Sequence, residues 1–178
     1  NHLMKRMMTV ENVHWFQNLF DELEIAVWID GGWGVDALLR EQTRPHEDLD
    51  IIIPTADSAK LVEALYERGF SDVHTDDRCD RNFVMGHAAH GLIDFHLIEL
   101  TEDGGGIYGP DEIDWILSAS ELHAEGSIGG RSVRCLTAEY QVRSHSGYTL
   151  HETDFADMDA LRRRFGVVLL PEHLGRDD

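Results

Sequence analysis

The sequence predicts an α+β fold, a mixed β-sheet flanked by helices with a short, mostly helical C-terminal part. β-favouring runs alternate with amphipathic helical patterns over the first two thirds of the chain, and helical spacing predominates after them. With 178 residues, of which 42% are hydrophobic, the chain is long enough to bury one ordinary core. We therefore expect a single compact domain, with a core over 4–136 and a helical segment over 137–178 packed on it.

The first expected element is a helix that begins after Thr9, a residue type typical of helix N-caps. Its apolar residues recur at the spacing of one helix face: Val10, Val13, Phe16, Leu19, Phe20 and Leu23. Two strand–helix pairs follow it. The expected strands cover 25–29 and 49–53, the second closed by Pro54, and the expected helices cover 33–40 and 58–68.

Strands and loops are expected in the middle of the chain, and helices at its end. The expected strands cover 70–74, 82–85, 92–100, 127–128 and 132–136, the last two forming a hairpin. The glycine-rich, acidic stretch 101–110 is expected to be a loop. Thr137 is placed to cap a helix that runs to about residue 146, and a last helix over 153–165 ends at Gly166.

The charge balance constrains the partners. There are 34 acidic and 15 basic residues, a formal net charge of −19. The chain lacks the clustered cations that displace counterions from phosphates, so we expect no nucleic-acid partner. The acidity favours a cationic partner, or serves only to keep a small domain in solution. No apolar run approaches the roughly 20 residues that a membrane-spanning helix needs, so no membrane partner is expected either.

The cysteines and the first residues bear on the compartment. Two cysteines, Cys79 and Cys135, are too few for a disulfide scaffold and are expected to be free thiols in a reducing cytoplasm. The three residues before Met4 look like a cloning remnant, and no apolar segment of a secretion signal follows them.

Two carboxylates mark the second strand. Asp48 and Asp50 flank Leu49, and because side chains alternate along a strand, both leave the same face about 7 Å apart. Like charges held this close near a sheet require a compensating cation. Oxygen ligands favour Mg2+ or Mn2+ over Zn2+.

A third carboxylate, Asp94, interrupts an apolar strand. Ile93, Phe95 and Leu97 occupy one face, so Asp94 stands on the other face together with His96, which is a candidate partner for it. An alternative is that Asp94 pairs only with an Arg or His and that Asp48 caps the start of its strand.

A glycine pair lies between the first strand and its helix. Gly31-Gly32 leaves backbone N–H groups open at a helix N-terminus, where the helix dipole favours phosphate oxygens. Taken alone the pair is more often a simple turn. Together with the three carboxylates it predicts a site for a phosphate-bearing ligand.

These motifs resemble a known superfamily. The glycine pair, the run His46-Glu47-Asp48-Leu49-Asp50-Ile51 and the later Asp94 resemble the signature of DNA polymerase β-type nucleotidyltransferases. The segments 28–36 and 43–50 are similar to the small antibiotic enzymes, namely lincosamide nucleotidyltransferases and aminoglycoside 2''-adenylyltransferases. The segment 145–154 resembles the lincosamide enzymes in particular. The resemblance covers most of 27–161.

The resemblance implies a fold and a reaction. In the polymerase β-type fold, Asp48 and Asp50 would hold Mg2+ or Mn2+ on the triphosphate of ATP or another NTP, and Gly31 and Gly32 would cradle its β and γ phosphates. A hydroxyl of a lincosamide or aminoglycoside antibiotic would attack the α-phosphorus in line and expel pyrophosphate. Asp94 would complete the metal site or take the proton of the attacking hydroxyl.

Two residues of the loop before the second strand are nucleotide-binding candidates. Arg44 suits phosphate because a guanidinium holds two oxygens at once, or it forms a salt bridge with Asp36 or Glu47. His46 donates to a phosphate, orients Asp48 or is a structural histidine. We expect Asp36 to fasten this loop through Arg44 or His46.

The candidates for an acceptor pocket lie near the end of the chain: His145, Tyr148, Glu152 and Asp154. Acids attract amines, and tyrosine offers a flat apolar face with a polar end, so these residues suit a hydroxylated, cationic small molecule. The alternative is that the two acids serve as caps at the start of the last helix.

The resemblance also bears on assembly. The chain lacks the long helical domain of the larger aminoglycoside enzymes, so we expect a homodimer in which a second subunit completes the pocket. Two other functions stay open: a toxin–antitoxin type of minimal nucleotidyltransferase that modifies a macromolecule, and a catalytically silent nucleotide-binding module.

Overall fold

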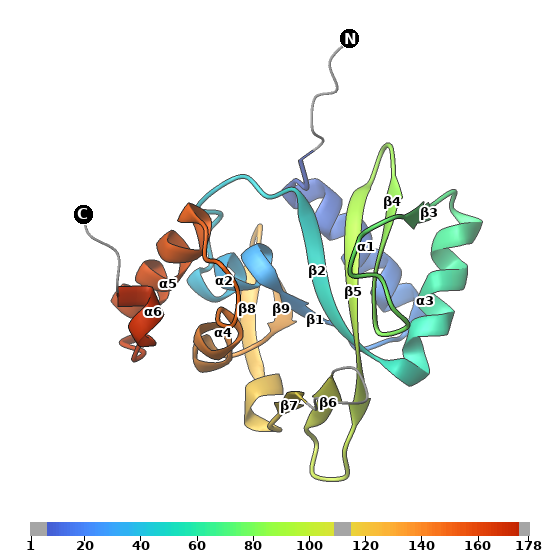
Figure 1. The fold of residues 1–178 in the computed structure, drawn as a ribbon. Coiled ribbons are helices and arrows are strands. Elements are labelled where there is room, and N and C mark those ends of the chain that lie inside the picture. The colour runs from blue at the N-terminus through green and yellow to red at the C-terminus, as the bar shows by residue number, and fades with distance from the viewer. Residues whose placement is uncertain (1–6, 109–114, 175–178) are drawn as a thin grey trace.

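A computed structural model describes residues 7–108 and 115–174. Its centre is a mixed sheet (Figure 1) in the order β3 (Ser71–Val73), β4 (Asn82–His87), β5 (Gly91–Leu100), β2 (Asp48–Pro54), β1 (Trp28–Asp30), β9 (Arg131–Cys135) and β8 (Ala124–Ile128). β2 pairs with β5, and β1 with β9, in parallel, and the other neighbours are antiparallel. The predicted mixed sheet is confirmed.

Two short strands extend one end of this sheet. β6 (Gly106–Tyr108) pairs with the last residues of β5, and β7 (Trp115–Leu117) pairs with β6. β6 lies inside the stretch 101–110 that was predicted to be a loop, so that prediction is wrong for its residues; 109–110 lie outside the described residues. The run of three glycines gives no strand signal in the sequence. β6 forms because β5 is long enough for its last residues to pair with it.

The helices are α1 (Val10–Leu23), α2 (Gly31–Leu39), α3 (Thr55–Glu67), α4 (Ala138–Ser144), α5 (Glu152–Phe165) and α6 (Pro171–Leu174), with a short 3-10 turn at Ser120–Leu122. Thr9 accepts a hydrogen bond from the Asn12 N–H in a capping box, and Thr137 accepts from the Tyr140 N–H, so both predicted N-caps are confirmed. α6 was not predicted, because four residues are too few to show a helical period.

The strand and helix boundaries depart from the predicted ones by a few residues. α2 begins at Gly31 itself, directly after β1, and Pro54 is the last residue of β2 instead of a stop after it. A proline is tolerated there because it ends the strand.

One face of the central strands is buried in the main core. The other face carries the acidic residues and, further along the strands, a second buried cluster that includes Trp28, Ile52 and Ile98. Leu49, Ile51, Ile93 and Phe95 are fully buried in the main core, together with residues of α1 and α3. The helical tail joins the same core, through Met158 and Leu161 of α5 among others. Burying each of these side chains stabilises the fold by about 1.5–3 kcal/mol. In the part of the chain that the structure describes, no helix has the length and apolar character needed to cross a membrane.

Candidate active site

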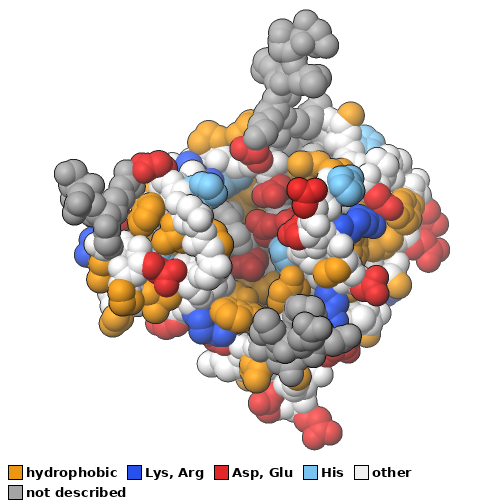
Figure 2. All heavy atoms as spheres, viewed as in Figure 1, with side chains coloured by type: hydrophobic (Ala, Val, Ile, Leu, Met, Phe, Trp, Pro, Cys, Tyr) orange, Lys and Arg blue, Asp and Glu red, His pale blue; other side chains and the backbone are white. Residues whose placement is uncertain are grey.

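Three carboxylates lie side by side across three neighbouring strands. Asp50 of β2 is the register partner of Asp30 on β1 and of Asp94 on β5, and Asp48 lies two residues earlier on the same face of β2. Figure 2 shows acidic side chains gathered around a hollow in the middle of this face. The predicted shared face of Asp48 and Asp50 is confirmed, and the pairing of β2 with β5 adds Asp94 to them.

His96 stands next to this row. Its Nε2 lies 3.5 Å from Asp50 Oδ1 and 3.6 Å from Asp94 Oδ1. Burial alone would lower the pKa of His96, but the hydrogen bond and charge of Asp50 and the charge of Asp94 outweigh burial and raise the pKa to about 9. His96 is therefore a partner of Asp94, as the sequence pattern suggested, and also of Asp50.

Burial and the neighbouring carboxylates both disfavour the charged forms of Asp48 and Asp94. Burial first, and the neighbouring Asp50 in addition, raise the pKa of Asp48 to about 7. For Asp94, burial is again the largest cause and is opposed by the charge of His96, while Asp50 adds to it; the pKa rises to about 8. Each carboxylate is thus held where its charged form is costly.

The donor set fits a divalent cation. Asp94 Oδ1 is buried and has no hydrogen-bond partner among the described residues. One ligand atom each from Asp50, Asp94 and His96 lies within 4.8 Å of the others, so the group that the structure brings together contains His96 in place of the predicted Asp48. Crowded carboxylate oxygens of this kind suit a hard cation, which would relieve both the repulsion and the unsatisfied oxygen.

The glycine turn approaches the carboxylate row closely. Gly31 has a φ of +61°, and a Cβ there would overlap the Asp50 carboxylate. A Cβ at Gly32 would lie 2.6 Å from His46 Nδ1 and 2.7 Å from Arg44 Nη2. Only glycine allows this backbone to run so near the acids, and it leaves the N-terminus of α2 open to a ligand's phosphates.

The two loop candidates have partners within the fold. Arg44 makes a bidentate ion pair with Asp157 of α5, with Nη2–Oδ2 at 2.9 Å and Nε–Oδ1 at 3.3 Å. Arg44 therefore forms a salt bridge, the alternative role given for it, but with Asp157 instead of Asp36 or Glu47. Asp157 could not be predicted because it lies 113 residues away in sequence.

Asp36 fastens the loop, as predicted, through His46. His46 is buried and its Nε2 lies 2.6 Å from Asp36 Oδ2. Asp36 also accepts hydrogen bonds from the side chain and the backbone N–H of Thr43. His46 therefore holds the loop, with its Nδ1 turned toward Gly32, and a contact between His46 and phosphate stays a prediction.

The acceptor candidates of the C-terminal segment form a small cluster. Tyr148 Oη donates to Asp154 Oδ1 at 3.2 Å, and His145 Nε2 lies 3.8 Å from the same oxygen. Asp154 also accepts from the His151 N–H at 2.8 Å, which is the capping role named as the alternative. Glu152 is exposed at the start of α5. Substrate contact by these four residues stays a prediction.

Three residues of the site were missed in the sequence. Asp30 completes the carboxylate row and accepts a hydrogen bond from Gln141 Nε2 at 3.0 Å. Tyr108 of β6 places its ring edge-on to His96, with ring centroids 5.8 Å apart. Asp30 falls between the expected strand 25–29 and the glycine pair, and Tyr108 lies in the expected loop 101–110. Gln141 is a single glutamine in an expected helix, and such a residue gives no signal in the sequence.

Comparison with known proteins decides the family. The sequence model of the aminoglycoside-2''-adenylyltransferase family matches residues 12–161. The chain belongs to this family. A lincosamide resistance protein of Staphylococcus haemolyticus is 30% identical over 156 residues, which cover 87% of this chain and 95% of that protein. A 2''-aminoglycoside nucleotidyltransferase of Klebsiella pneumoniae is 29% identical over 133 residues, covering 69% of this chain and 64% of that protein.

Solved structures agree with this family member's fold. The lincosamide antibiotic adenylyltransferase LnuA, with lincomycin bound, has a TM-score of 0.79 at 28% identity and covers 88% of this chain and 98% of its own. ANT(2'')-Ia in complex with adenylyl-2''-tobramycin has a TM-score of 0.67 at 21% identity and covers 86% and 87% of the two chains, which shows the shared fold. The protein is a nucleotidyltransferase with a polymerase β-type fold, a class that uses a nucleoside triphosphate and a divalent metal.

Proposed function

We propose that this chain transfers AMP from ATP to a hydroxyl of a small antibiotic of the lincosamide or aminoglycoside class. The observation that carries the proposal is the group of carboxylates Asp48, Asp50 and Asp94, one oxygen of which is buried without a hydrogen bond, directly beside the glycine turn at the N-terminus of α2. This arrangement suits the transfer of a charged phosphoryl group, since most of that catalysis is positioning and charge neutralisation.

Asp48 and Asp50 are the residues that would hold Mg2+, or Mn2+ in its place, with Asp94 beside them. When bound, the cation supplies positive charge that neutralises the triphosphate and the developing negative charge of the leaving pyrophosphate. His96 lies within reach of Asp50 and Asp94 and orients both carboxylates.

The backbone at Gly31 and Gly32 binds the phosphates in this proposal. The N–H groups and dipole of α2 attract the β and γ phosphates, and Arg44, whose guanidinium lies beside Gly32, adds positive charge on the same side. Arg44 also stays tied to Asp157, so it is a pre-positioned cation.

Asp94 is the residue we propose to take the proton of the acceptor hydroxyl. The hydroxyl oxygen forms a bond to the α-phosphorus, the bond from that phosphorus to the bridging oxygen breaks, and pyrophosphate leaves with the electron pair.

The proposed acceptor is hydroxylated and cationic. A formal net charge of −19 attracts amines to the protein. We also propose that the protein acts as a homodimer in the cytoplasm. Exposed Phe165 and Val168 at the end of the chain offer apolar surface to a second copy, and light scattering tests this association.

The experiment is pyrophosphate release from each of the four NTPs with Mg2+, against lincosamides and aminoglycosides. We expect release that depends on one class of acceptor and on ATP. Asp50→Asn abolishes it, whereas the matched exposed variant Asp76→Asn retains it. Release without any acceptor dependence, or equal release by Asp50→Asn, would contradict the proposal.

A further inference from the structure

A large apolar side chain is exposed beside the carboxylates. Leu92 of β5 is 36% exposed. It lies two residues before Asp94 on the same face and is the register partner of Asp48. A single exposed leucine is common on protein surfaces, and Leu92 matters here because it lines an apolar hollow.

Leu92 forms one wall of a hollow on this face. The hollow has a volume of about 420 Å3 and extends from the start of β2 over β5, β4 and β3. Its lining residues include Glu47, Ser71, Val73, Gly86, Ala88 and Leu92. The surface is mostly apolar, and Glu47, next to Asp48 in the chain, places one acid at its edge.

Gly86 sets the shape of the hollow. It pairs with Leu92 across β4 and β5 and with Ser71 across β3 and β4. A Cβ at Gly86 would lie 2.7 Å from Leu92 Cδ2 and 3.1 Å from Val73 Cγ2. Because Gly86 has no side chain, Leu92 and Val73 pack close to the backbone of β4. A larger residue at this position would displace both side chains into the hollow.

The geometry of the reaction determines which substrate comes from this side. In phosphoryl transfer the entering and leaving oxygens lie roughly in line, on opposite sides of the phosphorus. The phosphates belong at the N-terminus of α2, which follows β1. The strand order continues from β1 through β2, with Asp50, to β5, with Asp94, and then to β4 and β3. A hydroxyl that enters opposite the pyrophosphate therefore comes from the side of Asp94 and the hollow.

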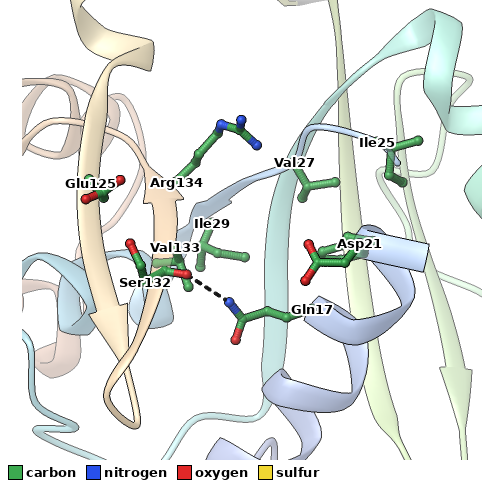
Figure 3. Close-up of a pocket in the computed structure, with 10 residues that line it drawn as sticks. Gln17, Asp21, Ile25, Val27, Ile29, Glu125, Ser132, Val133 and Arg134 are labelled. Atoms are coloured by element: carbon green, nitrogen blue, oxygen red, sulfur yellow. Dashed lines mark hydrogen bonds between the residues drawn. The ribbon is translucent and has the colours of Figure 1, made fainter. Parts of the chain in front are cut away.

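A second hollow is on the wrong face for this role. Figure 3 shows it between α1 and the β8–β9 hairpin, with Gln17, Asp21 and Arg134 in its wall. It also contains Ile29, whose side chain leaves β1 on the face opposite to Asp30. A ligand bound there is separated from the carboxylates by the sheet.

We propose that the hollow over β3, β4 and β5 holds the apolar body of the acceptor, and that it selects acceptors with alkyl groups and a single amine over polyamines. This inference rests on the proposed function. The alkyl part packs on Leu92 and Val73, and the hydroxyl reaches toward Asp94. A compact sugar with several amines would leave the apolar wall uncovered and place charge against it.

The test uses two variants that leave the carboxylates in place. Leu92→Ser removes the apolar wall, and Gly86→Ala narrows the hollow. Leu100→Ser is the matched control, because it is another exposed leucine of β5, eight residues further along and about 26 Å away. For each we measure KM for lincomycin and for ATP, and the affinity for lincomycin and tobramycin by calorimetry.

We expect Leu92→Ser and Gly86→Ala to raise KM for lincomycin about fivefold or more, with KM for ATP unchanged, and Leu100→Ser to change neither. The wild type binds lincomycin more tightly than tobramycin. A rise in KM for ATP instead would assign the hollow to the nucleotide and overturn the inference, as would tighter binding of tobramycin.

A variant of Tyr148 distinguishes between two acceptor sites, the hollow over β3, β4 and β5 and the C-terminal cluster of His145, Tyr148 and Asp154. If Tyr148→Ala raises KM for lincomycin while Leu92→Ser leaves it unchanged, the acceptor lies at the C-terminal cluster, and the inference is wrong although the proposed function stands. A wild type that neither modifies nor binds any acceptor overturns the proposed function and this inference with it.

Discussion

The side chains of Arg44 and Asp157 connect the loop before β2 to helix α5. Two hydrogen bonds connect their side chains, and Asp157 is only 5% exposed whereas Arg44 is 27% exposed. A nearly buried carboxylate depends on its partner, because an unpaired charge in that position would be costly. The same ion pair keeps the guanidinium next to Gly32. If Arg44 binds phosphate as proposed, stability and nucleotide binding are linked through one residue.

We predict that Arg44→Ala lowers the free energy of unfolding by about 2–3 kcal/mol, since it leaves Asp157 buried without its partner. Urea denaturation measures this change. The double variant Arg44→Ala with Asp157→Asn recovers part of the loss, because it removes the unpaired charge. The control is Arg162→Ala, whose ion pair with Asp159 is exposed on both sides and contributes less than about 1 kcal/mol. Equal losses in the two single variants would contradict the prediction.

The carboxylate row separates what sequence predicts from what it does not. Alternation along a strand places Asp48 with Asp50, and Asp94 with His96, and each pair was predicted correctly. Alternation does not say which strands are neighbours. Only the parallel pairing of β2 with β5 makes Asp50 and Asp94 register partners, and the sequence reached that result through a family resemblance.

The missed contacts share a physical reason. Gln141 reaches Asp30 across 111 residues of sequence, and Asp157 reaches Arg44 across 113. In a chain with 34 acids, many partners were available to Arg44, and its neighbours in sequence were the wrong choice. β6 is a strand because of the edge that β5 offers, and a three-residue segment after glycines shows no period of its own.

Asp94→Asn tests the role of the third carboxylate. The amide fills the same space but does not accept the proton of the acceptor hydroxyl, so we predict a fall in kcat of about 100-fold or more with ATP binding retained. Steady-state kinetics over a range of Mg2+ concentrations measure it. If the Mg2+ concentration needed for half-maximal activity is unchanged, Asp94 is the base. If that concentration rises, Asp94 is a metal ligand. A kcat within a few fold of wild type would exclude both roles.

Metal binding should stabilise the protein. A divalent cation relieves the repulsion among Asp48, Asp50 and Asp94, and at 100 times its Kd it adds about 2.7 kcal/mol, or a rise in Tm of roughly 5–10 °C. Thermal denaturation with EDTA and then with Mg2+ or Mn2+ measures the difference. Asp50→Asn should lose most of the rise, whereas Asp76→Asn, a change at an exposed carboxylate, should keep it. The same rise in both variants would place the metal elsewhere.

Gly32→Ala tests the turn as the phosphate site. The added Cβ would lie 2.6 Å from His46 Nδ1 and 2.7 Å from Arg44 Nη2, so both side chains must move away from the N-terminus of α2. We predict a rise in KM for ATP of about tenfold, with a smaller effect on KM for the acceptor, because one charge-assisted contact to phosphate is worth roughly 1.5 kcal/mol or more.

The control for Gly32→Ala is Gly130→Ala, which has a positive φ of +79° and open space around the new Cβ. It lowers stability by about 1 kcal/mol through backbone strain but leaves KM for ATP as in the wild type. If Gly32→Ala lowered stability by the same amount without any change in KM for ATP, the glycine pair would be a turn required by the fold alone. The phosphates would then bind elsewhere along the carboxylate row, and the in-line argument that directs the acceptor toward β5 would lose its starting point.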